Sequence, residues 1–178
     1  IPVYYNHQNG SAWHQGGSIG FAEYVDTPHT PRYFFGHGLS YTKFAYSGLQ
    51  IAQSSVKPED TVAITVEIEN TGKVKGDEVV QLYLRDVYAS MTRPVKELAG
   101  FKRIMLEPGE KRQVCFHLQC SQTAFLDSHM QWKVEKGQFE VQIGSSSEDI
   151  RQRGSFTITQ DRIVDGKSRG MYADVEVR

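Results

Sequence analysis

The chain has 178 residues, which is enough for one ordinary domain and some additional polypeptide. Its 20 Lys and Arg balance 21 Asp and Glu, so no basic excess exists to neutralise phosphates, and nucleic acid is not expected as a partner. The apolar runs are far shorter than a membrane span, and no membrane partner is expected. The chain begins at Ile1 without an initiator Met or a signal-peptide pattern, so we expect a piece of a longer protein.

The first 43 residues are predicted to form an extended, loop-rich segment. Only IPVYY, residues 1–5, reads as a strand, and the remainder is interrupted by prolines and glycines. These are Pro2, Pro28, Pro31, Gly10, Gly16, Gly17, Gly20, Gly36 and Gly38. A stretch this long without regular structure is unusual inside a compact domain, so we expect it to be functional or to lie against another domain.

From residue 45 onward apolar and polar residues alternate, which is typical of half-buried antiparallel strands. The predicted strands, with their inward residues, are 61–70 (Val62, Ile64, Val66, Ile68), 77–86 (Val80, Leu82, Leu84), 97–106, 112–119 (Val114, Phe116, Leu118), 137–144 (Phe139, Val141, Ile143) and 154–159 (Phe156, Ile158). Short strands separated by turns, one of them at Pro108 and Gly109, indicate an all-β, two-sheet sandwich. The tail 161–178 either adds a strand through YADVEV or forms a flexible extension.

The two cysteines, Cys115 and Cys120, are not expected to form a disulfide. They fall on one predicted strand and at its end, where neighbouring residues are poorly placed for a bridge, and Cys115 is predicted to face the polar side. Two cysteines provide neither a disulfide framework nor a zinc-type spacing. Free thiols favour a reducing compartment, without fixing where the whole protein works.

No arrangement of acids or histidines predicts a catalytic or metal site. Hydrolysis of a glycoside needs two carboxyl groups flanking the scissile bond, and no pattern pairs any two acids here. The candidates, which we expect to be solvated, are Glu23, Asp26, Asp77, Glu78, Glu97 and Asp127. The histidines, which lack the close spacing of a zinc site, are His7, His14, His29, His37, His117 and His129. We therefore expect no catalytic residue, no metal and no cofactor in this chain.

Residues 32–46, RYFFGHGLSYTKFAY, place six aromatic residues around a Gly-His-Gly turn. Phe34 and Phe35 would be costly to expose to water, and the flanking glycines permit a sharp turn. This composition predicts that residues 32–46 form a rigid apolar connection that docks the sandwich on another body. We call its part before the sandwich, residues 32–44, the joint. The residues expected to dock are Tyr33, Phe34, Phe35, Gly36, Gly38, Tyr41 and Phe44.

The segment PRYFFGHGLSYTKFAY, residues 31–46, resembles the P-x-[YF]-x-F-G-x-G-L-S-Y-T-x-F segment of glycoside hydrolase family 3. Other parts of that family's C-terminal fibronectin type III-like domain follow in order, namely NTG, G-x-E-V-V-Q-L-Y, RPVKELAGF and L-x-PGE. IPVYYNHQ resembles the last strand region of the preceding α/β sandwich domain. The resemblance covers about residues 1–160 and leaves the tail outside.

The resemblance implies an immunoglobulin or fibronectin type III-like two-sheet sandwich over residues 44–160. It assigns 1–43 to the end of an α/β sandwich domain and a linker, and 161–178 to a C-terminal extension. Family members are retaining β-glycosidases whose catalytic aspartate and acid/base residue lie upstream. We therefore expect an inactive structural domain that docks on, and stabilises, the catalytic domains of a longer parent enzyme. Only that parent, in a bacterial cytoplasm or periplasm, would bind a β-linked oligosaccharide or aryl glycoside.

Two other classes of protein stay open. A carbohydrate-binding or adhesive β-sandwich module needs a row of exposed aromatic residues on one sheet face. The outward rows predicted here contain none: they are Thr61, Thr65 and Glu67, and Cys115, His117 and Gln119. A general protein-interaction module needs an exposed apolar patch, which the joint would supply. In the loop 9–30, Trp13, His14 and Tyr24 either line the parent's substrate cleft or pack on a neighbouring domain.

Overall fold

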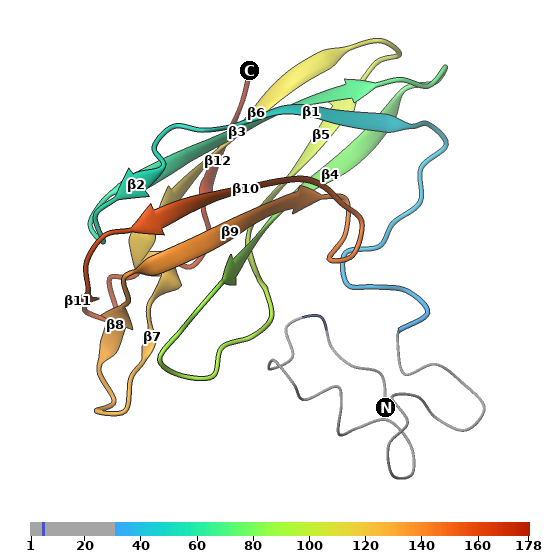
Figure 1. Ribbon diagram of the computed structural model, residues 1–178. Helices are drawn as coiled ribbons and strands as arrows, with labels where there is room; N and C mark the ends of the chain where they lie inside the picture. The colour runs from blue at the N-terminus through green and yellow to red at the C-terminus, as the bar shows by residue number, and fades with distance from the viewer. Residues whose placement is uncertain (1–4, 6–30) are drawn as a thin grey trace, which may run out of the picture.

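The computed structural model describes residue 5 and residues 31–178, which form an almost entirely β structure (Figure 1). Its strands are β1 (Phe44–Ile51), β2 (Ser55–Val56), β3 (Thr61–Asn70), β4 (Gly76–Asp86), β5 (Glu97–Leu106), β6 (Lys111–Gln119), β7 (Phe125–Leu126), β8 (Trp132–Val134), β9 (Gly137–Gly144), β10 (Ile150–Ile158), β11 (Arg162–Ile163) and β12 (Asp174–Val177). One short 3₁₀ turn, η1 (Cys120–Thr123), follows β6.

The strands form two main sheets that lie face to face (Figure 1). The first sheet has the order β1-β3-β6-β12 and the second has the order β2-β10-β9-β4-β5, while β11-β8-β7 make a small third sheet at one end. Neighbouring strands are antiparallel except β2, which runs parallel to β10. The prediction of an all-β, two-sheet sandwich is confirmed.

The core lies between the two main sheets and is built from the alternating apolar rows of their strands. Every inward residue predicted from the sequence is buried. The inward residues of β3 and β6 have no exposed surface at all, and they are Val62, Ile64, Val66, Ile68, Val114, Phe116 and Leu118. A fully buried Val, Leu, Ile or Phe stabilises a fold by roughly 1.5–3 kcal/mol, so these rows account for a stable sandwich. The predicted turn at Gly109 is also present, with a φ of 77°.

Three buried residues do not follow the simple inward pattern. Gln81 and Tyr83 lie on the outer face of β4, yet both are buried because other parts of the chain cover them. Cys115 lies outside the core cluster, on the face of β6 that points away from the core as predicted, yet it is only 6% exposed, with β3 and β12 paired on either side of β6. Both cysteines are free, as expected.

The tail takes the strand alternative, because β12 pairs with β6 and widens the first sheet. Its register sets Val175 opposite Phe116 and Glu176 opposite Cys115. Among the residues that the structure describes, no helix is long and apolar enough to cross a membrane. Within the same residues, no three His, Cys, Asp or Glu side chains gather closely enough to hold a metal ion.

Candidate domain-docking site

The joint turns sharply just before it meets the sandwich. The amide of His37 donates a hydrogen bond of 2.9 Å to the carbonyl oxygen of Phe34, which closes the turn. Gly36 has a φ of 80°, a conformation that residues with a Cβ rarely adopt. The ring of Tyr33 lies 5.2 Å from that of His37, so the histidine is engaged locally, as its position between two glycines indicated.

Gln81 holds this turn against the outer face of the second sheet. Its amide nitrogen donates to the carbonyl oxygens of Gly36, at 3.2 Å, and Ser145, at 2.5 Å. The hydroxyl of Tyr83 donates a hydrogen bond of 2.6 Å to the side-chain amide oxygen of Gln81. Because only 4% of Gln81 is exposed, these bonds are shielded from water and fix the turn firmly.

Gly36 is required at this position by space as well as by its backbone angle. A Cβ there would lie 2.1 Å from the side-chain oxygen of Gln81, which is closer than any real contact. Gly38 differs, because the position of its Cβ is open and its φ is not in the left-handed region. The amide of Ser147 adds a further bond of 2.9 Å to the Phe35 carbonyl oxygen.

Tyr5 extends the joint with a second aromatic contact. Its ring stacks on Phe35 at a centroid distance of 4.2 Å and meets Tyr83 edge-on at 5.9 Å. The backbone amide of Leu98 in β5 donates to the Tyr5 hydroxyl at 3.4 Å. Burial raises the pKa of both the Tyr5 and the Tyr83 hydroxyl, so both stay protonated at neutral pH. A residue far upstream of the sandwich is thereby packed on β4 and β5.

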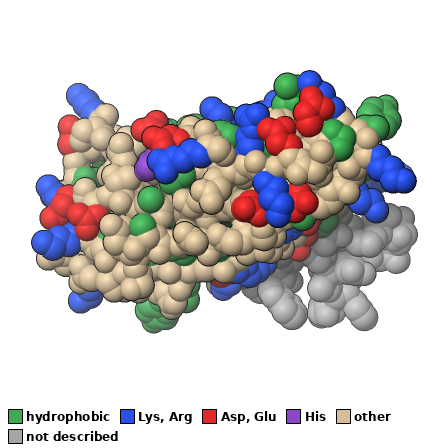
Figure 2. Space-filling model, turned by 90° about the horizontal axis from the view of Figure 1, so that it is seen from above, with side chains coloured by type: hydrophobic (Ala, Val, Ile, Leu, Met, Phe, Trp, Pro, Cys, Tyr) green, Lys and Arg blue, Asp and Glu red, His purple; other side chains and the backbone are tan. Residues whose placement is uncertain are grey.

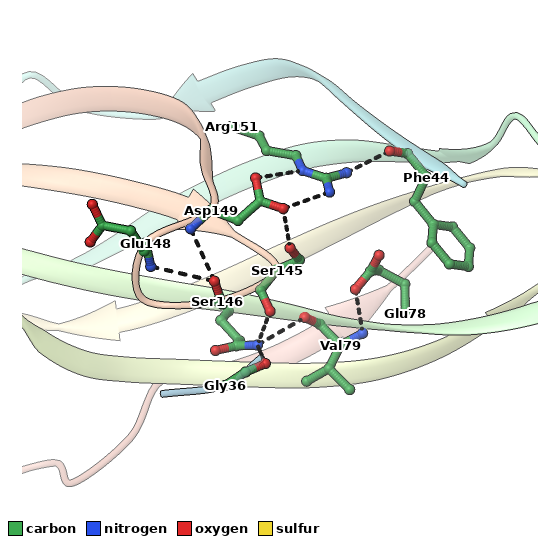
Figure 3. Close-up of polar contacts among 10 residues, drawn as sticks. Gly36, Phe44, Glu78, Val79, Ser145, Ser146, Glu148, Asp149 and Arg151 are labelled. Atoms are coloured by element: carbon green, nitrogen blue, oxygen red, sulfur yellow. Dashed lines mark hydrogen bonds and ion pairs between the residues drawn. The ribbon is translucent and has the colours of Figure 1, made fainter. Parts of the chain in front are cut away.

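An ion pair fastens the start of β1, where the joint ends (Figure 3). Arg151 donates to the carbonyl oxygen of Phe44 at 2.6 Å and to both carboxylate oxygens of Asp149 at 3.1 and 2.8 Å. Ser145 donates to the same carboxylate at 2.7 Å. The Arg151 hydrogen bond is the main cause that lowers the pKa of Asp149, so this anchor is charged at neutral pH.

Glu78 lies beside this anchor in a half-buried position. Burial is the main cause that raises its pKa, and only the amide of Val79, the hydroxyl of Tyr46 and the charge of Arg151 oppose the shift. The hydroxyl of Tyr46 is itself buried, and burial raises its pKa strongly. A carboxyl group that was expected to be solvated is therefore partly desolvated at the joint.

Asn70 ties the joint to the first sheet from the other side. Its side-chain oxygen accepts hydrogen bonds from the hydroxyl of Thr42 at 2.6 Å and from the amide of Gly72 at 3.1 Å. Its side-chain nitrogen donates to the carbonyl oxygens of Val74 and Leu106 at 2.9 and 3.0 Å. The Asn-Thr-Gly triplet after β3 thus has a local structural role, which sequence reasoning identified only as a turn.

The predicted docking residues fall into two groups. Phe44 is buried in the core as the first residue of β1, and Phe34 is partly buried. Tyr33, Phe35 and Tyr41 are exposed, as is Leu39, which was not among the predictions. Between the joint, the start of β4 and the turn 144–150 lies an open cavity of about 430 Å³. The joint therefore has one face bound to the sandwich and an opposite apolar face turned outward.

The remaining candidates lie apart from one another. Asp77 pairs with Arg103, Glu97 pairs with Arg93 at 2.8 Å, and Asp127 accepts hydrogen bonds from the amides of its own turn. None of these is paired with another acid within residues 31–178. The candidates that lie outside the described residues are Glu23, Asp26, His7, His14, His29, Trp13 and Tyr24. Trp132 packs at the core edge under the guanidinium of Arg169, 4.2 Å from its ring.

Sequence reasoning missed the three residues that hold the joint, namely Asn70, Gln81 and Arg151. Gln81 and Arg151 occupy outward positions of their strands, where a polar residue is normally solvated. Signals for two of them were present, since the Asn of NTG and the Gln of G-x-E-V-V-Q-L-Y stood in the family motifs without an assigned role.

Comparison with known proteins supports the same domain. Residues 78–147 match the fibronectin type III-like domain. A periplasmic β-glucosidase of Salmonella typhimurium is 41% identical over 160 residues, which cover 89% of this chain and 21% of the relative. A thermostable β-glucosidase B of Acetivibrio thermocellus is 40% identical over 81% of this chain and 19% of its own length. A β-xylosidase of Formosa agariphila is 44% identical over 72% of this chain and 18% of its own.

Two solved structures share the fold. A β-glucosidase of Listeria innocua in complex with glucose superposes with a TM-score of 0.77 at 34% identity, over 89% of this chain and 22% of that one. β-Glucosidase 3B of Thermotoga neapolitana in complex with α-D-glucose superposes with a TM-score of 0.71 at 34% identity, over 76% of this chain and 18% of that one. The chain spans about a fifth of the length of these proteins. It resembles the C-terminal part of a family 3 glycoside hydrolase, as its motifs indicated.

Proposed function

We propose that this chain, which resembles the C-terminal part of a family 3 glycoside hydrolase, is a non-catalytic structural domain. In a parent enzyme that hydrolyses terminal β-D-glucosides or related sugars with retention of configuration, it would dock on the catalytic domains and stabilise them. The joint provides the contact, and the sugar would be bound by the parent's upstream domains.

One observation carries this proposal: the joint is rigidly held on one side and apolar on the other. Gln81, Arg151 and Asn70 fix its backbone, while Tyr33, Phe35, Leu39 and Tyr41 remain exposed. A flexible linker would not need such bonds, and four large apolar side chains exposed within nine residues are more than a free surface segment normally carries. A fixed apolar face is the form expected of a contact with a neighbouring domain.

The first test is activity. The purified chain should release no product from a chromogenic β-glucoside above the uncatalysed rate, because the family resemblance places the catalytic aspartate and the acid/base residue in domains upstream of this chain. Hydrolysis above background that survives repurification would refute the non-catalytic assignment.

The second test uses Phe35→Ala in the parent enzyme. Removing the exposed ring should lower the parent's unfolding free energy by about 1–3 kcal/mol and leave its Michaelis constant unchanged. Met130→Ala, at an exposed position of the β7–β8 hairpin, is the matched control and should change neither quantity. An unchanged melting temperature with a changed Michaelis constant would contradict docking through the joint.

A carbohydrate-binding or adhesive module is the second candidate, and one observation favours it. Phe101 and Tyr172 are both more than half exposed and meet edge-on at 6.3 Å. The face seen in Figure 2 offers no broad aromatic row, because Lys, Arg, Asp and Glu side chains of both signs are interspersed there. Isothermal titration of the chain with a soluble β-glucan decides between the two, since a structural domain should give no binding heat.

Trp13, His14 and Tyr24 lie outside the described residues, and we keep them as proposed substrate-proximal residues of the parent. Trp13→Ala in the parent should then raise the Michaelis constant for an aryl glycoside, because an indole provides an apolar wall for the ring. An unchanged turnover and Michaelis constant would leave Trp13 only a packing role.

A further inference from the structure

The connection between β4 and β5, residues 87–96, is long for a hairpin and projects beyond the end of the sheets (Figure 1). A hollow lies on each side of it. The larger, about 710 Å³, is lined by the loop itself together with Gln142 and Arg153. The smaller, about 190 Å³, is lined by Tyr5, Arg93, Gln122 and parts of β4 and β5. Arg93 lines both hollows and joins them.

Buried polar atoms without partners gather around these hollows. Within the described part of the chain, five buried side-chain atoms have no hydrogen-bond partner, and three of them belong to Arg93, Gln122 and Gln142. They are the Arg93 Nε and the side-chain oxygens of the two glutamines. Gln142 is only 4% exposed. Such atoms are rare in native proteins because they lose their water without replacing it, so each marks a position where a bound water or a group of a neighbouring domain would form a hydrogen bond.

The loop also presents apolar side chains to solvent. Tyr88 is 87% exposed, and Val87 and Met91 are each more than two-fifths exposed. These residues line the larger hollow together with Gln142. Exposed aromatic and aliphatic side chains of this kind are typical of the apolar centre of a protein contact, and polar groups beside them form hydrogen bonds across the interface.

Upstream polypeptide already reaches this place. Tyr5 lines the smaller hollow, and its hydroxyl accepts a hydrogen bond from the amide of Leu98 in β5. Burial raises the pKa of Asp86, which lines both hollows, and this agrees with a site that is shielded from water. Tyr5, a described residue that precedes the joint in the sequence, is thus seated beside the loop.

We infer that the loop 87–96 and its two hollows form a second contact for the upstream catalytic body of the same enzyme, beside the joint. This inference rests on the proposed function and names the surface through which the docking is completed. The partner must supply donors to the oxygens of Gln122 and Gln142, an acceptor for the Arg93 Nε, and apolar groups over Tyr88. A backbone loop of the upstream body meets these needs, because each peptide group has both a donor and an acceptor.

Hydrogen exchange by mass spectrometry tests the inference on the parent enzyme and on this chain. Peptides covering 87–96 should exchange at least tenfold more slowly in the parent, as should peptides covering 33–41. If only 33–41 is protected, the second contact is refuted and docking through the joint stands. If neither is protected, both proposals fail.

A substitution with different effects in the two proteins gives an independent test. Gln142→Leu removes the unpartnered oxygen together with the 3.1 Å hydrogen bond from the side-chain nitrogen to Glu140, so the melting temperature of the isolated chain should change little, whereas that of the parent should fall. Gln138→Leu, on the same strand but exposed, is the matched control and should affect both proteins alike. Equal effects of Gln142→Leu in chain and parent would overturn the second contact.

The same hollows could instead serve a sugar, and a titration separates the two ligands. A soluble β-glucan oligosaccharide should give no binding heat with the isolated chain. Binding that is lost in Tyr88→Ala but kept in Tyr172→Ala would show that the loop is a carbohydrate site and would overturn its assignment to the upstream body.

Discussion

At the scale of single residues, the joint depends on one glutamine and one glycine. Gln81 satisfies two carbonyl oxygens with its side-chain nitrogen and is itself oriented by the hydroxyl of Tyr83. Gly36 must lie directly over Gln81, where a Cβ finds no room. The path by which the chain enters the sandwich is therefore fixed by two features, namely the missing side chain of Gly36 and the buried side chain of Gln81.

Gly36→Ala should loosen the joint, whereas Gly38→Ala should not. The first substitution combines a φ of 80° with a clash against Gln81, and such strain costs about 1–3 kcal/mol. The amide of Ser147, which donates to Phe35, should then exchange its hydrogen roughly tenfold faster or more. Equal exchange rates for both variants would contradict the steric role of Gly36.

Glu78 makes the stability of the joint depend on pH. Its pKa is raised above 4.5 in the folded chain, mainly by burial, so the folded state holds the proton more tightly than the unfolded state. Stability should therefore fall as the pH rises from 4.5 through the raised pKa and stay lower above it. The neighbouring Asp149 behaves in the opposite way, since its lowered pKa contributes stability that is lost only below pH 3.8.

Glu78→Gln consequently should raise the melting temperature of the chain at pH 8 and have a much smaller effect at pH 4, where the carboxyl is protonated in both states. Thermal unfolding followed by circular dichroism at the two pH values measures this difference. Glu140→Gln, on an ion-paired carboxylate of β9, serves as the control and should lower the melting temperature slightly at pH 8. A lower melting temperature of Glu78→Gln at pH 8 would refute the destabilising role of its charge.

At the scale of secondary structure, alternation was sufficient to predict the long strands. The inward rows of β3, β6 and β9 depend only on neighbouring residues along one strand, so a period of two reveals them. The outer face of β4 could not be predicted in this way. Gln81 and Tyr83 are buried by Gly36 and Tyr5, which are 45 and 78 positions away in the sequence, and no local pattern reports such contacts.

The tail illustrates the same limit. YADVEV fitted either a strand or a flexible extension, because four residues of alternating pattern are too few to decide. The strand forms because β12 pairs with the edge of β6 that β3 leaves open. An uncovered edge would expose a row of unpaired backbone groups, so β12 stabilises the first sheet and shields Cys115 at the same time.

Removing residues 174–178 should make one thiol reactive. In the intact chain Cys115 is covered in β6 and Cys120 is fully buried, where burial raises its thiol pKa to about 12. Without β12, the thiol of Cys115 should react with a disulfide reagent within minutes under native conditions, and the thiol of Cys120 should not. The truncated chain with Cys115→Ser is the control. Two reactive thiols, or none, would contradict a local role of β12.

At the scale of the whole molecule, the sandwich buries its own core, but the surface around the joint leaves large apolar side chains exposed. The buried apolar residues of the two sheets form one core, and Lys, Arg, Asp and Glu side chains are scattered over the face in Figure 2. The joint and the loop 87–96, in contrast, carry exposed aromatic and aliphatic side chains. Both lie beside Tyr5, a described residue that precedes the joint, and the chain spans about a fifth of its relatives' length.

An uncovered joint should make the isolated chain self-associate as its concentration rises. Leu39 is 94% exposed and Tyr41 is fully exposed, and covering each in a dimer would contribute about 1.5 kcal/mol or more. Leu39→Ser combined with Tyr41→Ser should therefore weaken dimerisation by roughly tenfold to a hundredfold in sedimentation velocity. Met130→Ser, which removes a similarly exposed side chain from the β7–β8 hairpin, should leave it unchanged. A chain that stays monomeric at all concentrations, or dimers equally sensitive to Met130→Ser, would mean that the joint is not the adhesive surface.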